Sequence, residues 1–162
     1  MEIHFNQIER SDLPFINEVR NASCEYLHNP SKFTLDQTGI WYDQVYLNTS
    51  GYWFIVYVDN QPIGYLRRSI QDDKHYIGMD IHPNHRGKGY SKAIYKEFIS
   101  YRYKVTKTKD LWLEVLKTNP RAIHIYESLG FEKVDEYDFS RDGEITTSYV
   151  YKLNLEKWFN TQ

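Results

Sequence analysis

The stretch that most constrains the fold is residues 75–101, where a strand-like segment leads through a glycine-containing loop into a helical segment. The loop reads Arg86-Gly87-Lys88-Gly89, and two glycines allow a tight turn and the close approach of a ligand. The first N–H groups of the following helix have no partner within the helix, and the helix dipole favours an anion beside them. The pattern therefore predicts an anion site, and the alternative is a plain strand-to-helix connection with a solvated basic loop.

The spacing of this loop excludes the two best-known phosphate-binding patterns. It contains neither G-x-x-x-x-G-K-[ST] nor G-x-G-x-x-G. The net charge of −2 argues against a general nucleic-acid binder, but ten Lys/Arg and only three Asp/Glu lie between His82 and Arg121. The basic excess around the loop favours an anionic small molecule as the ligand.

Hydrophobic periodicity predicts an α/β (α+β) fold in a single domain over residues 1–162. We expect a mixed, mostly antiparallel central sheet of about seven strands with about four helices. The expected strands cover residues 1–7, 52–58, 63–70, 76–81, 111–116, 131–140 and 144–155. Because residues 76–81 and 111–116 flank a helix, a right-handed crossover should make these two strands parallel.

Helix caps and turns place the boundaries between these elements. Ser11 and Asn119 are candidate N-caps, and Thr34 with Gln37 forms a capping-box pattern. Residues 48–51 are expected to turn, residues 104–109 to connect a helix to a strand, and residues 159–162 to form a loose tail.

Nothing in the sequence predicts secretion or membrane insertion. The N-terminus has no basic segment followed by an apolar one, and no run of about 18 apolar residues occurs. The single cysteine, Cys24, cannot form an internal disulfide. We therefore expect a cytoplasmic protein without a membrane partner.

Four motifs in register carry a family resemblance. They are Asp80-Ile81-His82-Pro83 at the end of a strand, the pattern Q/R-x-x-G-x-G/A over residues 86–91, the segment LEVLKTN, and N-x-x-A-x-x-x-Y-x-x-x-G-F over residues 119–131. Together they cover residues 75–131, and the chain resembles the GNAT superfamily of acyl-CoA-dependent N-acetyltransferases. Ser91 departs from the family pattern, which usually has Gly or Ala there.

The resemblance implies a GNAT fold with splayed central parallel strands and acetyl-CoA as co-substrate. The pyrophosphate would be held by backbone N–H groups of Arg86, Gly87, Lys88, Gly89, Tyr90 and Ser91. Strand N–H groups near Ile81 would bind the pantetheine arm and polarise the thioester, and Asn119 would add a side-chain contact. No metal is expected, because the histidine spacing matches no zinc pattern and this transfer needs none.

Tyr126 is the candidate general acid, because a phenol beside the sulfur can donate a proton to the leaving thiolate. Spacing alone favours a core aromatic at this position, and the catalytic role comes from the resemblance. The base that accepts the proton of the amine is a choice among Asp80, His75, Glu114 and water, with Asp80 preferred for its position beside Ile81.

The resemblance implies an N-acetyltransferase acting on a primary amine acceptor. Arg20-Asn21 with Trp41-Tyr42 is similar to acetyltransferases of amino sugars and nucleotide-linked amino sugars, so a small-molecule acceptor is expected. The alternatives are a peptide or protein acetyltransferase acting on N-termini or lysines, and a non-catalytic acyl-CoA-binding sensor. A monomer or homodimer without nucleic acid is expected.

Overall fold

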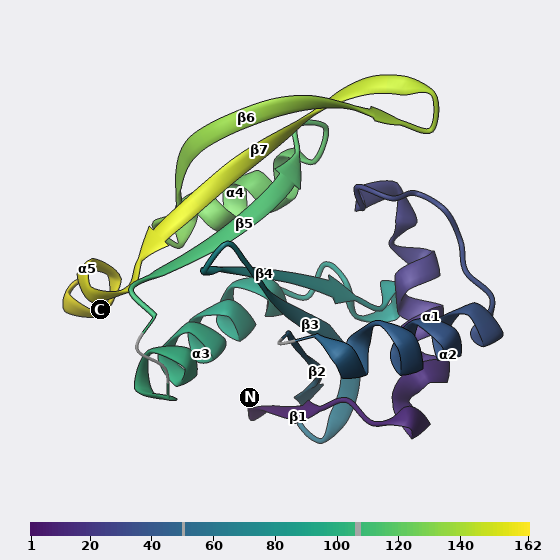
Figure 1. Ribbon diagram of the computed structural model, residues 1–162. Coiled ribbons are helices and arrows are strands. Elements are labelled where there is room, and N and C mark those ends of the chain that lie inside the picture. The colour runs from purple at the N-terminus through teal and green to yellow at the C-terminus, as the bar shows by residue number, and fades with distance from the viewer. Residues whose placement is uncertain (50, 106–107) are drawn as a thin grey trace.

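The protein is organised around one twisted sheet, shown in the computed structural model in Figure 1. Within residues 1–49, 51–105 and 108–162, which the structure describes, the sheet has seven strands in the order β1-β2-β3-β4-β5-β7-β6. They are β1 Ile3–Gln7, β2 Tyr52–Val58, β3 Gln61–Gln71, β4 Lys74–Ile81, β5 Asp110–Leu116, β6 Glu132–Arg141 and β7 Glu144–Asn154. The seven strands expected from the sequence are all confirmed. Ser50 of the expected turn 48–51 and residues 106–107 of the expected connection 104–109 lie outside the described residues.

Only β4 and β5 run parallel, and every other neighbouring pair of strands in this sheet is antiparallel. A single Cα pair, Tyr76 with Trp112, joins the two parallel strands. On its other side β4 pairs with β3 along its whole length, from Lys74 to Ile81. The two central strands therefore diverge after Tyr76, which confirms the splayed sheet. Among the residues that the structure describes, the edge of β4 that faces β5 has no strand partner beyond that point.

Helices cover both faces of the sheet (Figure 1). The described residues form five α-helices: α1 Leu13–Ala22, α2 Leu35–Gln44, α3 Tyr90–Val105, α4 Pro120–Ser128 and α5 Leu155–Asn160. One buried cluster joins α3, α4 and α5 to the sheet and includes Ile94, Phe98 and Leu113. A second cluster joins α1 to the other face and includes Ile16 and Tyr65.

Two of the expected helix ends differ from the structure, and the expected caps of α2 and α4 are confirmed. The expected loose tail 159–162 is helical in part, because α5 extends to Asn160. The Asn154 side chain caps this helix, and Leu155 and Trp158 are buried. Ser11 does not cap a helix, because a 3₁₀ turn at Arg10–Asp12 with a capping box between Glu9 and Asp12 comes first. The capping box of Thr34 and Gln37 at the start of α2 is confirmed.

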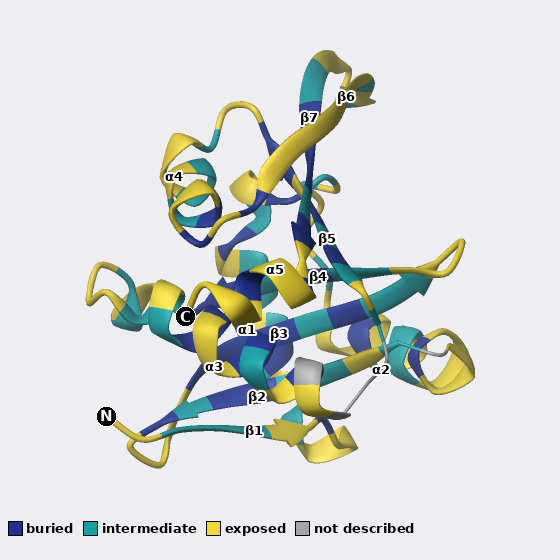
Figure 2. Ribbon diagram, turned by 90° about the vertical axis from the view of Figure 1, so that its left-hand side faces the viewer, coloured by how far each residue is buried: buried dark blue, intermediate teal, exposed yellow. Residues whose placement is uncertain are grey.

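Side-chain alternation along the strands decides which residues reach each face. In β3, Leu66 is fully buried toward α3, so its neighbours Tyr65 and Arg67 point to the face that carries α1 and α2. Asp80 and Gly78 of β4 lie opposite these two residues in the register. Figure 2 shows that the middle of the sheet is buried, whereas β6 is exposed along most of its length.

No helix within the described residues is long and apolar enough to cross a membrane.

Candidate active site

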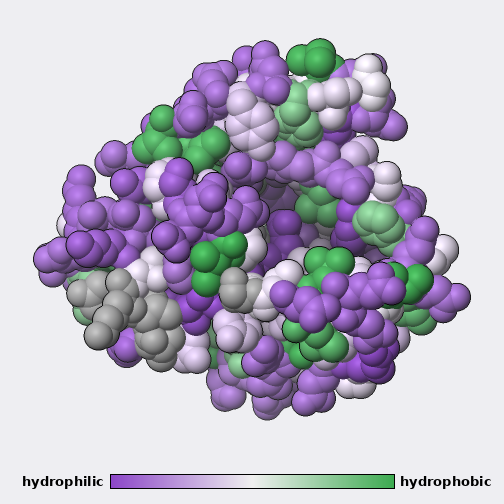
Figure 3. Space-filling view, in the orientation of Figure 1, coloured by the Kyte–Doolittle hydropathy of each residue, from purple (hydrophilic) through white to green (hydrophobic). Residues whose placement is uncertain are grey.

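A cavity of about 740 Å³ lies where β4 and β5 diverge. Its walls come from α1, α2 and the segment between them, from β2, β3, β4 and β5, and from the first two turns of α3 and α4. Figure 3 shows this hollow between the part of the molecule around the β6–β7 hairpin and the part around α1 and α2. The cavity connects the glycine loop at one end to the face of the sheet under α1 and α2 at the other.

The glycine loop forms the end of the cavity next to α3. Gly87 and Gly89 have φ values of +74° and +77°, a left-handed conformation that side chains rarely adopt, so glycine is required at both positions. Tyr90, Ser91 and Lys92 in the first turn of α3 also line the cavity, so the unpaired N–H groups of that turn are directed toward its mouth. Lys88 is not among the lining residues.

Two arginines, Arg86 and Arg121, lie at the loop and have different roles. The Arg86 side chain donates to the Ile81 carbonyl oxygen at 2.9 Å and to Ser23 Oγ at 2.9 Å, so it ties the loop to β4 and α1. Arg121 at the start of α4 lies against the loop, with Nη2 3.9 Å from where a Cβ of Gly87 would be. Arg121 lines the cavity and supplies a cationic side chain at this end.

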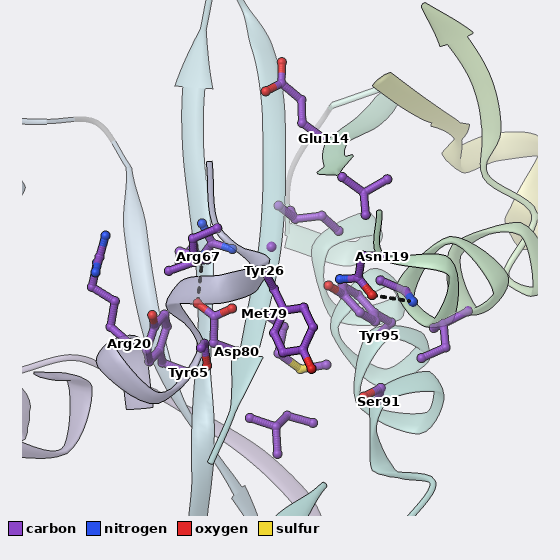
Figure 4. Close-up of a pocket in the computed structure, with 18 of the residues that line it drawn as sticks. Arg20, Tyr26, Tyr65, Arg67, Met79, Asp80, Ser91, Tyr95, Glu114 and Asn119 are labelled. Carbon is purple, nitrogen blue, oxygen red and sulfur yellow. Dashed lines mark hydrogen bonds and ion pairs between the residues drawn. The ribbon is translucent and has the colours of Figure 1, made fainter. Parts of the chain in front are cut away.

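Asn119 and Ile81 line the middle of the cavity. Asn119 caps α4 by accepting a hydrogen bond from the Ala122 N–H at 3.3 Å, as the sequence predicts. Its amide nitrogen, Nδ2, has no hydrogen-bond partner within the part of the chain that the structure describes, and Figure 4 shows the side chain beside Tyr95. Ile81 ends β4, whose edge toward β5 is open in this region.

Two tyrosines meet at the divergence of the strands. The Tyr126 hydroxyl lies 3.3 Å from the Tyr95 hydroxyl, and both residues line the cavity although they are at most 9% exposed. Burial raises the pKa of Tyr126 above its usual value, against a smaller opposing effect of the hydrogen bond from Tyr95. Burial raises the pKa of Tyr95 well above its usual value. Both phenols are therefore protonated at neutral pH.

Asp80 lies on the floor of the cavity on the side of α1 and α2. Its carboxylate is 7% exposed, and Oδ2 is 3.6 Å from Arg67 Nε without a hydrogen bond (Figure 4). Tyr65 lies opposite Asp80 in the register, and burial followed by the charge of Asp80 raises the pKa of Tyr65 well above its usual value. Burial lowers the pKa of Arg67, but the charge of Asp80 together with smaller effects of the neighbouring tyrosines raises it overall, so the guanidinium stays charged.

The structure separates the other two candidate bases. Glu114 lines the cavity, where Oε2 accepts from the Tyr137 hydroxyl at 2.8 Å and lies 3.7 Å from His28 Nε2. His75 does not line the cavity, because it lies at the start of β4 and its ring contacts Arg68 and Thr108. Of the side chains considered as base, Asp80 and Glu114 are therefore brought to the site.

The segment between α1 and α2 covers the far end of the cavity. Arg20 donates to the carbonyl oxygens of Asn29 and Ser31 and lies over the Phe33 ring at 4.2 Å. Trp41 of α2 packs on Trp53 with ring centroids 4.7 Å apart. Arg20, Phe33, Trp41 and Trp53 also line a second cavity of about 240 Å³ between α1 and α2. Asn21 and Tyr42 line neither cavity; Asn21 bonds the Phe33 backbone, and Tyr42 stacks on Tyr46.

Sequence reasoning missed Arg67, Tyr95 and Arg121. A charged residue flanked by apolar residues in a predicted strand, as in IGYLRRSI, is a signal that could have drawn attention to Arg67. Tyr95 resembles an ordinary core aromatic at helical spacing, and only its contact with Tyr126 marks it. The described residues contain no cluster of three or more His, Cys, Asp or Glu that could hold a metal ion, and the expectation that no metal takes part stays a prediction.

Comparison with known proteins places these features in a family. Residues 13–131 match the acetyltransferase (GNAT) family. The spermidine N(1)-acetyltransferase of Vibrio cholerae is 25% identical over 142 residues, covering 80% of this chain and 79% of that protein. The enzyme of the same name from Escherichia coli K12 is 27% identical over 150 residues, covering 88% of this chain and 80% of that protein. The crystal structure of spermidine N-acetyltransferase from Vibrio cholerae in complex with CoA and spermine superposes with a TM-score of 0.84 at 23% identity over 98% of both chains.

Proposed function

This chain belongs to the acetyltransferase (GNAT) family and is an acetyl-CoA-dependent N-acetyltransferase, and we propose that it transfers the acetyl group directly to a primary amine of a small molecule. The observation that carries the proposal is a buried, protonated phenol, Tyr126, in the cavity where β4 and β5 diverge. We further propose that residues 1–162 form a single domain.

The residues of the cavity fit the co-substrate. N–H groups of the glycine loop and of the first turn of α3, with Arg121 beside them, would hold the pyrophosphate. The open edge of β4 near Ile81 and the side-chain amide of Asn119 offer donors and acceptors to the pantetheine arm. The activated acetyl thioester supplies the acyl group and a good leaving group.

Each proton in the transfer has a residue to carry it. The amine nitrogen forms a bond to the acetyl carbon as the carbon–sulfur bond breaks, and Tyr126 Oη gives its proton to the departing sulfur. Asp80 takes the proton that the amine loses, directly or through a water molecule. The Arg67 guanidinium lies beside this carboxylate, with Nε 3.6 Å from Asp80 Oδ2. Tyr95 orients the Tyr126 hydroxyl.

The acceptor side is the face under α1 and α2. The relatives are named for spermidine, so polyamines are one candidate acceptor class. The pair Arg20-Asn21 with Trp41-Tyr42 suggests amino sugars instead, and the structure brings only Arg20 and Trp41 of these four residues to the cavity. Both classes offer the primary amine that the mechanism requires.

Release of free CoA thiol from acetyl-CoA tests the proposal, using spermidine, amino sugars, amino acids and short peptides as acceptors. We expect at least one small amine to raise the release well above hydrolysis, with a product heavier by one acetyl group in mass spectrometry. Binding of acetyl-CoA without any acceptor-dependent release would instead favour a non-catalytic sensor.

A further inference from the structure

We propose that the acceptor carries an oxyanion near its primary amine, and that Arg67 binds this oxyanion. The proposal rests on the N-acetyltransfer proposed above and names the class of amine that the site accepts. A carboxylate and a phosphate share the required chemistry.

Arg67 lies on the floor of the acceptor side of the cavity. It comes from the middle of β3, and its side chain is 37% exposed. The guanidinium lies over Gly78 of the neighbouring strand, because a Cβ at that glycine would be 2.6 Å from Arg67 Nη2. Glycine at position 78 thus leaves the space that lets the guanidinium rest against the sheet while it faces the cavity (Figure 4).

The hydrogen-bond donors of Arg67 are not used by the protein. Within the residues that the structure describes, Nε is buried without an acceptor, and the ion pair with Asp80 at 3.6 Å is too long for a hydrogen bond. No other hydrogen bond from this guanidinium occurs in the same part of the chain. A buried donor without an acceptor is costly, and a guanidinium presents a planar fork that matches the two oxygens of a carboxylate or a phosphate. The arrangement therefore suits an incoming oxyanion.

The charges around the acceptor side oppose a purely cationic acceptor. This side of the cavity holds two arginines, Arg20 and Arg67, and two carboxylates, Asp80 and Glu114. Asp80 is already paired with Arg67, and Glu114 already accepts from Tyr137. A polyamine would find no surplus of negative charge and would bring a second ammonium group toward Arg67, where like charges repel. An acceptor with one amine and one oxyanion matches the balanced charges.

Pairs of amines that differ only by an anionic group provide the test. Ornithine is compared with putrescine for the carboxylate, glucosamine 6-phosphate with glucosamine for the phosphate, and spermidine is the polycationic reference. In at least one pair we expect kcat/KM of the anionic member to exceed that of its partner by about tenfold or more, which equals about 1.4 kcal/mol. The pair that shows this preference identifies the source of the oxyanion.

The variant Arg67→Gln should abolish this preference, mainly by raising KM for the anionic member. Arg10→Gln is the matched control, because Arg10 is an exposed arginine paired with Asp43 away from the cavity, and it should leave the preference unchanged. Calorimetric titration with CoA verifies that each variant is folded. If Arg67→Gln proves unstable because it leaves Asp80 unpaired, the double variant Arg67→Gln/Asp80→Asn removes both charges. Once this double variant is shown to bind CoA, calorimetric titration with the anionic amine measures its affinity directly, and we expect that binding to be lost.

Two results would overturn the inference and leave the proposed function intact. One is a kcat/KM for spermidine above that of every anionic amine. The other is an equal loss of kcat for both members of a pair in Arg67→Gln, which would mean that Arg67 only positions Asp80. Absence of CoA release with every amine would instead overturn the proposed function, and the inference with it.

Discussion

Replacing Tyr126 by phenylalanine removes one hydroxyl group from the point where the central strands diverge. If that hydroxyl is the general acid, the acetyl transfer loses its proton donor while the aromatic ring and its packing remain. General acid catalysis typically contributes about 10²- to 10⁴-fold in rate, or roughly 3–5 kcal/mol. We therefore expect kcat to fall by about 100-fold or more, with affinity for acetyl-CoA nearly unchanged.

Tyr95→Phe provides a matched control for this prediction. Both variants lose the same 3.3 Å hydrogen bond between the two hydroxyls. A hydrogen bond of this kind contributes about 0.5–1.5 kcal/mol, so both variants should lose a similar, small free energy of unfolding. Only Tyr126→Phe removes the acid, and Tyr95→Phe should lower kcat by only a few fold.

Three measurements separate a catalytic from a structural role of Tyr126. Steady-state thiol release gives kcat, calorimetric titration with acetyl-CoA gives the affinity, and urea unfolding gives the stability. Equal kcat values for the two variants, or a Tyr126→Phe rate within a few fold of the unsubstituted enzyme, would refute the acid role. Tyr126 would then be a core aromatic that shares a hydrogen bond with Tyr95.

Three further predictions follow from particular residues. Gly89→Val should weaken CoA binding by about tenfold or more, because φ is +77° at this position and such backbone strain costs about 1–3 kcal/mol. Gly143→Val is the control: φ is +81° there, at the tip of a hairpin, so this variant should lose stability but keep its affinity for CoA in calorimetric titration. Gly78→Ala should push the Arg67 guanidinium aside and lower kcat/KM for the preferred acceptor by roughly tenfold with no change in CoA affinity; an unchanged kcat/KM would contradict this. Burial lowers the pKa of His28 in the folded protein below its value in the unfolded chain, which is about 6.5. The stability that the neutral ring contributes is therefore present above the unfolded pKa and is lost as the pH falls through the folded pKa. Urea midpoints at about pH 7.5 and about pH 5.5 should differ more for the unsubstituted protein than for His28→Asn, and equal differences would count against the prediction.

Much of the fold could be predicted from local sequence because short-range patterns specify it. Alternating and continuous apolar runs locate the strands, and residues such as Asp59 and Asn60, which tolerate positive φ, mark tight hairpin turns. A capping residue gave the wrong helix start at Ser11, because a 3₁₀ turn competes with the cap there. The sequence also did not reveal α5, because the stability of this helix comes from the burial of Leu155 and Trp158. Burial of a short terminal helix depends on distant strands that local patterns do not reveal.

The candidate site was only partly predictable. The family resemblance identified the glycine loop, Asn119 and Tyr126, and the structure brings residues of this loop, Asn119 and Tyr126 to one cavity. Among the candidate bases, position beside Ile81 favoured Asp80, but His75 lies on the same strand, and only the tertiary structure places His75 away from the cavity. The charged side chains on the proposed acceptor side, Arg20, Arg67, Asp80 and Glu114, come from α1, β3, β4 and β5. No spacing pattern in the sequence links these four residues.

The sequence by itself determined the element order, the glycine loop and the family resemblance, since these depend on residues close together in the chain and on their backbone preferences. Only the tertiary structure decided how far β4 and β5 diverge, that Tyr95 pairs with Tyr126, and that Arg67 lies over Gly78 beside Asp80. The physical reason is that electrostatics and hydrogen bonding depend on distances of a few ångströms between segments far apart in the chain. The glycine loop is thus encoded locally, whereas the acceptor side is assembled by the fold.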